Sequence, residues 1–292
     1  KCYERSFKAT SIPHMEERIG TFIAGALCVG LCLFGIRGRV GYNPIKVSQA
    51  YYCEDSFLNQ LGVSPVFNLL TSTLDDNRKE NRYLQLMNEE EAIAQVQKHL
   101  GRKGIADISP IAQKVKQDTI TMHRNLVLIF MESMSAQLMQ AFGQSKILTP
   151  YLDSLYLESL SFNNIYSAGI HTNHGLYSTL YSFPTIMKRN AMKGSVIPIY
   201  SGLPTVLKDN GYHNLFFMTH ESQYDNMNAF FRTNGFDEIY AEENYPKEKI
   251  VNHFGVQDDY LYEYALPILT QRANKGKPFF ATLLSISNHP PY

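Results

Sequence analysis

Glu132 and Thr172 are the two residues whose types and positions could do chemistry together. Glu132 ends the apolar run Asn125-Leu-Val-Leu-Ile-Phe-Met-Glu-Ser133, a pattern typical of a strand buried on both faces of an α/β sheet. Ligands of such sheets bind at the carboxyl ends of the strands, so Glu132 is expected where a metal ion or a reacting group would be held. The alternative is that Glu132 caps the following helix, where the helix dipole favours a negative charge.

Thr172 stands in the segment Ser167-Ala-Gly-Ile-His-Thr-Asn-His-Gly175, between a glycine-containing turn and a helical pattern. Its hydroxyl is therefore expected at a helix N-terminus, where backbone N–H groups stabilise an anion. A hydroxyl is a competent nucleophile only with a base, a cationic neighbour or a metal. Glu132 could supply the metal site, with His171 and His174 as supporting polar groups. The alternative is that Thr172 is an ordinary N-cap, a position that threonine fills routinely.

Several motifs in this order resemble one enzyme family. The Glu132 motif, the segment Leu148-Thr-Pro-Tyr-Leu-Asp153 and the pattern Gly-x-x-Thr-x-x-Gly around Thr172 resemble the alkaline-phosphatase superfamily. Within it, they are similar to the sulfatase-like branch that holds lipoteichoic acid synthases and phosphoglycerol transferases. The resemblance covers roughly residues 45 to 292, with further matches at Pro204-Thr-Val-Leu-Lys-Asp-Asn-Gly-Tyr212, Phe216-Phe-Met-Thr-His220, Asn234-Gly-Phe-Asp237, Phe254-Gly-Val-Gln-Asp258 and Ser287-Asn-His-Pro-Pro-Tyr292.

The resemblance implies a covalent phospho-intermediate on a threonine beside one divalent metal. Carried over by motif, Glu132 is a metal ligand, and Thr172 is the nucleophile and a further ligand. Oxygen ligands suit Mg²⁺ or Mn²⁺, and an added imidazole permits Mn²⁺ or Zn²⁺; by resemblance, Mn²⁺ is the first expectation. The family's remaining ligands are an Asp-His pair beyond the His-Pro segment, whereas this sequence ends at Tyr292. We therefore expect a fragment with an incomplete metal site, inactive on its own.

Substrate-binding residues are also implied by the resemblance. His220 and His289 each follow an apolar segment typical of a strand, and by resemblance they would bind the phosphate or head group of the substrate. The loop after His220 adds Tyr224, Asp225 and Asn226 to the candidates. Tyr224 takes the place of an aromatic residue of the lipoteichoic acid synthases. Asp225 and Asn226 stand where a phosphate clamp would want a cation, and no Arg or Lys follows before Arg232.

Two function classes are disfavoured. The motif Cys/Ser-x-Pro-x-Arg, which arylsulfatases need for their formylglycine nucleophile, does not occur in the sequence. Lys plus Arg equals Asp plus Glu at 27 each, so nothing predicts a nucleic-acid surface.

Residues 19–36 form an uncharged stretch of 18 residues, which as a helix spans about 27 Å, the lower limit for a hydrocarbon core. This segment is predicted to be a transmembrane helix, with a buried core helix as the alternative. By resemblance, the protein is expected in the cell membrane, multi-pass in its full-length form, with the catalytic domain outside the cytoplasm.

The sequence predicts three regions: the end of a membrane domain (1–40), a helical connector (41–120) and the N-terminal part of a sulfatase-like catalytic domain (121–292). Alternating strands and helices in the third region favour an α/β fold of the alkaline-phosphatase type, a mostly parallel sheet with helices on both faces. We expect that sheet to be truncated. The expected strands are 125–131, 160–166, 213–219, 237–240 and 278–286, and the expected helices are 148–159, one beginning at Thr172, 202–210, 226–234 and 256–274.

The leading hypothesis is a membrane-anchored, metal-dependent phosphotransferase. It would move a phosphoglycerol-type group from a phospholipid donor to an envelope glycan or polymer acceptor through a threonine intermediate. The alternatives on the same fold are a phosphoethanolamine transferase, a phosphodiesterase or a sulfuric ester hydrolase. A catalytically dead binding or sensor protein is the non-enzymatic alternative.

Overall fold

The computed structural model describes residues 15–40, 44–53, 55–77, 86–101, 112, 123–182, 190–194 and 197–289. The chain divides into two compact units, residues 1–46 and residues 47–292. The predicted region boundaries at 40 and 120 stay predictions.

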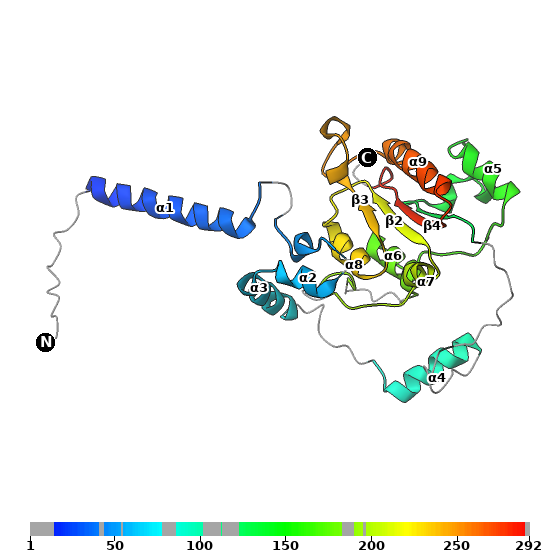
Figure 1. Cartoon of the computed structure of the whole chain (residues 1–292), viewed down its shortest axis with the longest axis horizontal. Coiled ribbons are helices and arrows are strands. Elements are labelled where there is room, and N and C mark those ends of the chain that lie inside the picture. Colours follow the sequence, from blue (N-terminus) through cyan, green and yellow to red (C-terminus); the bar gives the residue numbers. More distant parts are fainter. Residues whose placement is uncertain are drawn as a thin grey trace. The chain divides into compact units, whose positions relative to one another are not determined.

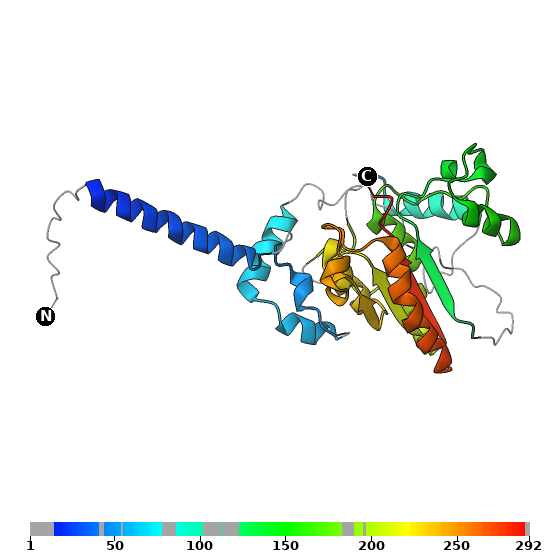
Figure 2. The same cartoon turned by 90° about the horizontal axis from the view of Figure 1, so that it is seen from above.

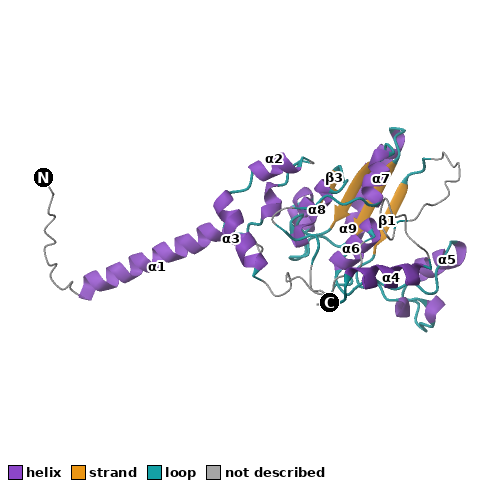
Figure 3. Ribbon diagram, turned by 90° about the horizontal axis from the view of Figure 1, so that it is seen from below, coloured by secondary structure: helices purple, strands orange, loops and turns teal. Residues whose placement is uncertain are grey.

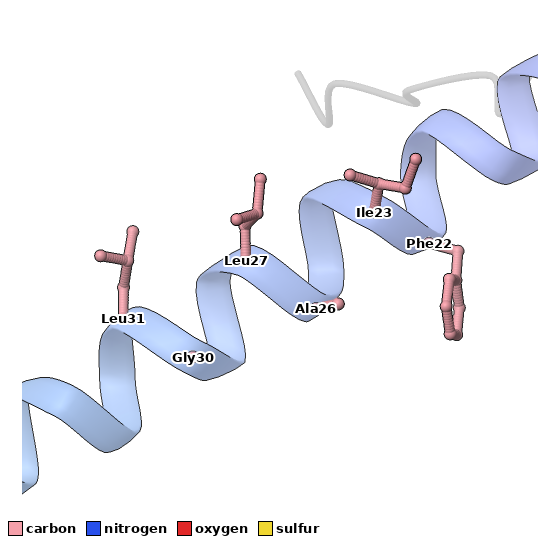
Figure 4. Close-up of a pocket in the computed structure, with 6 residues that line it drawn as sticks. All are labelled: Phe22, Ile23, Ala26, Leu27, Gly30 and Leu31. Atoms are coloured by element: carbon pink, nitrogen blue, oxygen red, sulfur yellow. The ribbon is translucent and has the colours of Figure 1, made fainter.

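The first unit is dominated by one long apolar helix, α1 (Met15–Arg37), drawn in blue in Figure 1. Its stretch Arg18–Arg37 has a mean hydropathy of 2.3, and none of the stretch is buried against the described residues. Figure 4 shows apolar side chains, among them Phe22, Leu27 and Leu31, projecting from this single helix. By its length and composition, the helix is long and apolar enough to cross a membrane.

Short helices follow at the start of the second unit: η1 (Val47–Ala50), α2 (Ser56–Leu61), α3 (Pro65–Asp76) and α4 (Glu89–Leu100). Helix α4 shows how the sequence sets its ends, because the Asn88 side chain caps its first turn and Gly101 closes it with a φ of 64°. Three glutamates stand in that first turn, where the helix dipole favours them, and no described residue of α4 is buried. Tyr51, by contrast, is buried in the core of the second unit.

A parallel four-stranded sheet forms the centre of the second unit, with the strand order β1-β4-β2-β3 (Figures 1 and 3). Its strands are β1 (Leu126–Phe130), β2 (His213–Met218), β3 (Glu238–Tyr240) and β4 (Phe279–Leu284). All described pairings are parallel, and each strand lies inside its predicted range. The predicted parallel α/β sheet is therefore confirmed.

Helices cover both faces of this sheet: α6 (Thr172–Tyr181), α7 (Leu203–Asp209), α8 (Met227–Thr233) and α9 (Asp258–Asn274). Helix α5 (Pro150–Glu158) precedes them along the chain and has no buried residue. Side chains alternate between faces along β2, as a pleated strand requires. Phe216 packs in the core that contains residues of α6 and α8. Phe217 packs in a second core with Leu261 of α9, the helix that Figure 2 shows running along the sheet. The predicted helices are thus found with shifts of a few residues at their ends.

The predicted strand at 160–166 is wrong. These residues have no regular secondary structure, and Leu160 and Phe162 are exposed. Polar side chains bond to the backbone here instead, since the Ser159 hydroxyl donates to Leu155 O at 2.5 Å. The Ser161 hydroxyl likewise contacts the carbonyl oxygen of Tyr156. Local bonds of this type compete with a strand ladder, and β4 takes the place beside β1.

Candidate active site

Glu132 lies two residues beyond the end of β1, at the carboxyl edge of the sheet. Its backbone N–H donates to the hydroxyl of Ser285, which follows β4, at 2.9 Å. Ser133 adopts a φ of 51°, and this turn carries the chain out of the sheet. The next helical turn is capped by Ser135, whose hydroxyl accepts from Gln137 N. The alternative that Glu132 caps the following helix is therefore not met, because Ser135 is the cap.

Thr172 is the first residue of α6, and the N-cap is His171. The Thr172 hydroxyl donates to Oε2 of Glu132 at 2.7 Å, across 40 residues of sequence. The cap alternative for Thr172 is therefore contradicted, because the hydroxyl is engaged by the carboxylate. Leu176 and Leu180 of α6 are fully buried, so the helix that carries Thr172 is fixed by the core.

The residues next to Thr172 are buried and polar. Asn173 is 7% exposed, and its side-chain oxygen has no hydrogen-bond partner among the described residues. His174 is buried, and its Nδ1 has no partner there either. Burial lowers the pKa of His174, with the neighbouring His171 acting in the same direction. The rings of the two histidines meet edge to face at 5.1 Å.

His220 follows the end of β2 and is buried, with its ring centroid 4.6 Å from that of Tyr224. Burial lowers the pKa of His220, and the carbonyl of Glu221 and the nearby carboxylates oppose this shift without reversing it. Asp225 and Glu132 are among those carboxylates. The lowered pKa favours the neutral form of the His220 imidazole. Burial raises the pKa of Tyr224, and the charges of Asp225 and Glu132 raise it further.

Asp225 and Asn226 hold two loops together. Both have positive φ angles, 49° and 66°. Asp225 accepts from the Asn173 amide through Oδ2 at 3.1 Å and pairs with Lys193 Nζ through Oδ1 at 2.6 Å. The Asn226 amide donates to Met192 O at 2.6 Å. A cation therefore does stand beside this loop, although it comes from residue 193 and not from the loop sequence.

His289 lies apart from the residues around Glu132 and Thr172. It belongs to a cluster formed by the loop after β4 and residues 251–257. Its ring is 4.5 Å from that of Phe254, beside a hollow of about 210 Å³. Gly255 anchors residues 251–257 against β2, because its φ is +84° and an added Cβ would lie 1.8 Å from Thr219 O. The Asp258 carboxylate accepts from the backbone of Ser287, which joins the two loops.

The donor chemistry of Glu132 and Thr172 suits an oxygen-preferring divalent cation such as Mg²⁺ or Mn²⁺. These two side chains supply adjoining oxygen atoms at one strand end. Within the described ranges, no group of three or more His, Cys, Asp or Glu residues is arranged to hold a metal. The two oxygens fit part of a metal site, and no complete site is present in this part of the chain.

Contacts and electrostatic coupling thus bring Glu132, Thr172, His220, Tyr224 and Asp225 together. Three further residues contribute to this site and are not among the candidates predicted from the sequence: Ser285, Asn173 and Lys193. Asn173 stands inside the Thr172 motif and could have been noticed there. Lys193 carries no such signal, because no sequence pattern links residue 193 to residue 225.

Comparisons with known proteins agree with this architecture. A solved protein of the alkaline phosphatase superfamily from Vibrio parahaemolyticus is 30% identical, with a TM-score of 0.64 over 70% of this chain and 51% of that one. The lipoteichoic acid synthase LtaP from Listeria monocytogenes is 26% identical, with a TM-score of 0.52 over 58% of this chain and 42% of that one. The second unit therefore has the alkaline-phosphatase-like α/β fold.

The sequence model of the Sulfatase family matches residues 124–292. This chain belongs to the sulfatase family, within the alkaline-phosphatase superfamily. It is also similar to phosphoglycerol transferase I of Xanthomonas campestris pv. campestris, with 27% identity over 192 residues and 61% of this chain. The chain spans 27% of the length of that relative. Proteins of this family are generally metal-dependent.

Proposed function

We propose that this protein is a membrane-anchored transferase that moves a phosphoglycerol-type group from a phospholipid to an envelope glycan or polymer. The observation that carries the proposal is the 2.7 Å contact between the Thr172 hydroxyl and the Glu132 carboxylate at the carboxyl edge of the sheet. Similarity to phosphoglycerol transferase I supports the choice of group.

In the proposed reaction, the Thr172 oxygen attacks the phosphorus of the donor's head-group phosphodiester. A new bond forms between phosphorus and Thr172 Oγ1, and the bond to the diacylglycerol oxygen breaks. The threonine proton passes to the departing oxygen, so diacylglycerol leaves as the alcohol. An acceptor hydroxyl then attacks the same phosphorus, the bond between phosphorus and Thr172 Oγ1 breaks, and the acceptor's proton passes to Thr172. Both half-reactions depend on in-line positioning and on stabilising the charge of the equatorial oxygens.

Glu132 and Thr172 are the residues of this chain that would hold a divalent metal, with Mn²⁺ as the first choice. When bound, such an ion polarises phosphoryl oxygens and favours the deprotonated nucleophile. Glu132 fixes the position of the Thr172 hydroxyl, and its own backbone is fixed by Ser285. Nδ1 of His220 lies 3.1 Å from the carbonyl oxygen of Glu221, so the neutral imidazole presents Nε2 as an acceptor for a hydroxyl of the head group.

The remaining substrate contacts are assigned to His289, Tyr224 and Asn226, and Asp225 organises the loop that carries two of them. We further propose that α1 is a membrane helix and that the full-length protein is multi-pass. Its catalytic unit would then act outside the cytoplasm on lipid head groups and envelope polymer. The apolar, exposed surface of α1 supports the anchor.

The test uses the full-length protein in vesicles that contain phosphatidylglycerol labelled in its head group, with an envelope glycan as acceptor. We expect Thr172→Ala to lower label transfer by several orders of magnitude while the melting temperature shifts by only a few degrees. Thr179→Ala, an exposed threonine on the same helix, is the matched control and should keep its rate.

Near-normal transfer by Thr172→Ala would refute the threonine mechanism. Transfer of label from phosphatidylethanolamine in place of phosphatidylglycerol would refute the phosphoglycerol assignment. Mass spectrometry of a quenched reaction should find the head-group phosphate on the peptide that contains Thr172.

A further inference from the structure

The loop of residues 224–226 is fastened to residues 192–193 by two contacts. Asn226 donates from its amide to Met192 O, and Asp225 pairs with Lys193. The backbone of Met192 is in turn held by the Asn190 side chain at 2.9 Å. Lys193 therefore emerges from a loop whose position is set by the loop that follows His220.

Two consecutive non-glycine residues, Asp225 and Asn226, adopt left-handed backbone angles. Non-glycine residues are uncommon in this region, although Asp and Asn adopt it more readily than others, and such backbone angles are often retained at functional sites. Here the strained turn gives Asp225 two different partners. One of its oxygens is used by Asn173, directly after Thr172, and the other by Lys193. The Lys193 ammonium is thereby tied to the residue next to the proposed nucleophile.

Several negative charges gather near Asp225, so a phosphate bound there would need a cation beside it. Glu132 and Asp225 both act on His220 and Tyr224, and a phosphodiester carries a further negative charge. Arg232, the next cation along the loop sequence, donates its Nε to Asn228 at 2.8 Å. Lys193 is held against one of the carboxylates, and its side chain is 53% exposed. An ammonium has three N–H donors, so one can serve Asp225 while another contacts a ligand.

We propose that Lys193 binds the anionic phosphate of the donor head group, and that Asp225 positions Lys193 for this contact. The proposal rests on the proposed function for the identity of the substrate. It supplies the cation that the loop 221–228 lacks. It also gives Asp225 a positioning role.

A second Lys–Asp pair provides a matched control. Lys208 pairs with Asp237 at 2.8 Å, and Asp237 has the same 16% side-chain exposure as Asp225. Asp237 accepts from the backbone of Asn214 near the start of β2, so this pair lies at the amino ends of the strands. Lys208→Gln should therefore disturb a similar ion pair without touching the substrate.

The experiment measures the initial rate of phosphoglycerol transfer against donor concentration for the full-length wild type and for variants. Losing a hydrogen bond to a charged group costs about 1.5–3 kcal/mol, so Lys193→Gln should raise KM for the donor by about 10- to 100-fold. Lys193→Arg should retain most of the affinity. Asp225→Asn should raise KM as well, and the double variant should be little worse than Lys193→Gln, because the two residues act as one unit.

Lys208→Gln should leave KM unchanged. A KM for Lys193→Gln that matches wild type, or that rises no more than for Lys208→Gln, would overturn the proposal. Melting temperatures of all variants identify any effect that comes from folding alone. Calorimetry of glycerol phosphate binding tests the role of Lys193 separately from the proposed function. If wild type fails to transfer phosphoglycerol, the proposed function falls, and the Kd ratio between wild type and Lys193→Gln still decides the role of Lys193.

Discussion

Ser285 accepts the backbone N–H of Glu132 at 2.9 Å, although the two residues are 153 positions apart. The bond joins the carboxyl ends of β1 and β4, and Ser285 N in turn donates to Phe130 O at 3.0 Å. The carboxylate that contacts Thr172 is therefore positioned by the neighbouring strand as well as by its own. Ser285 is 5% exposed, so water does not readily replace its hydroxyl.

Replacing Ser285 with alanine should impair the site more than the fold. The variant leaves the Glu132 N–H without its acceptor, which costs about 1–3 kcal/mol, and it loosens the turn that carries the carboxylate. We expect lower kcat for transfer together with a modest fall in melting temperature. Ser178→Ala removes a hydroxyl that donates to His174 O within α6 and serves as control. Equal kcat for wild type and Ser285→Ala would contradict the argument.

Gly255 should tolerate alanine much less well than Gly211. Both have φ angles near +85°, but only at Gly255 would the new Cβ meet backbone, at 1.8 Å from Thr219 O. Gly211→Ala should cost about 1–2 kcal/mol from its backbone angle alone. Gly255→Ala adds a clash that must push residues 251–257 away from His220. The loss of stability in this variant should therefore be clearly larger. Urea denaturation midpoints of the two variants test this. A similar loss of stability in both variants would show that the backbone around Gly255 moves aside to accept the new Cβ.

Glu238 should make stability depend on pH in the acid range. Burial acts to raise its pKa, but hydrogen bonds from Tyr240 and His213 and the Arg272 guanidinium bring it below the ordinary 4.5. The folded state thus binds the proton more weakly than the unfolded state. The carboxylate therefore stabilises the fold above the unfolded pKa, and this contribution is lost as pH falls through the folded pKa.

Glu238→Gln should accordingly melt below wild type at pH 7, and the difference should shrink as pH falls below about 4.5. Melting curves from pH 7 to pH 3 measure it. Glu263→Gln, on an exposed part of α9, is the control and should show little difference at any pH. A gap for Glu238→Gln that stayed constant with pH would rule out the carboxylate as its source.

Asn228, on α8, should hold residues 47–53 against the rest of the second unit. Its amide donates to Tyr51 O at 2.9 Å, and its side-chain oxygen accepts from Arg232. We expect Asn228→Ala to destabilise the protein by about 1–3 kcal/mol and to speed hydrogen exchange in residues 47–53. Asn210→Ala, which removes an amide that bonds within its own turn, should leave that exchange unchanged. Unaltered exchange in Asn228→Ala would show that the packing of Tyr51 alone holds residues 47–53 in place.

The sequence predicted the sheet well because its strands are short apolar runs bounded by polar residues. It also predicted that Glu132 and Thr172 belong together, on the strength of strand-end placement and family resemblance. The strand at 160–166 was wrong because apolar composition alone does not create a neighbouring strand to pair with. Lys193 was missed for a related reason: its partner is set by how two loops fold, and no local periodicity encodes that contact.

Strand β1 has one neighbour, β4, in the described sheet, and Leu126, Val127 and Ile129 are exposed. Helix α6 is instead anchored by fully buried side chains. The two partners of the 2.7 Å contact therefore stand on elements of unequal local stability. Glu132 should separate from Thr172 through opening of the β1–β4 ladder well before the core around α6 unfolds, so amides of β4 that face β1 should exchange with solvent sooner than those of α6. The lifetime of the contact between Glu132 and Thr172 is then governed by a five-residue ladder.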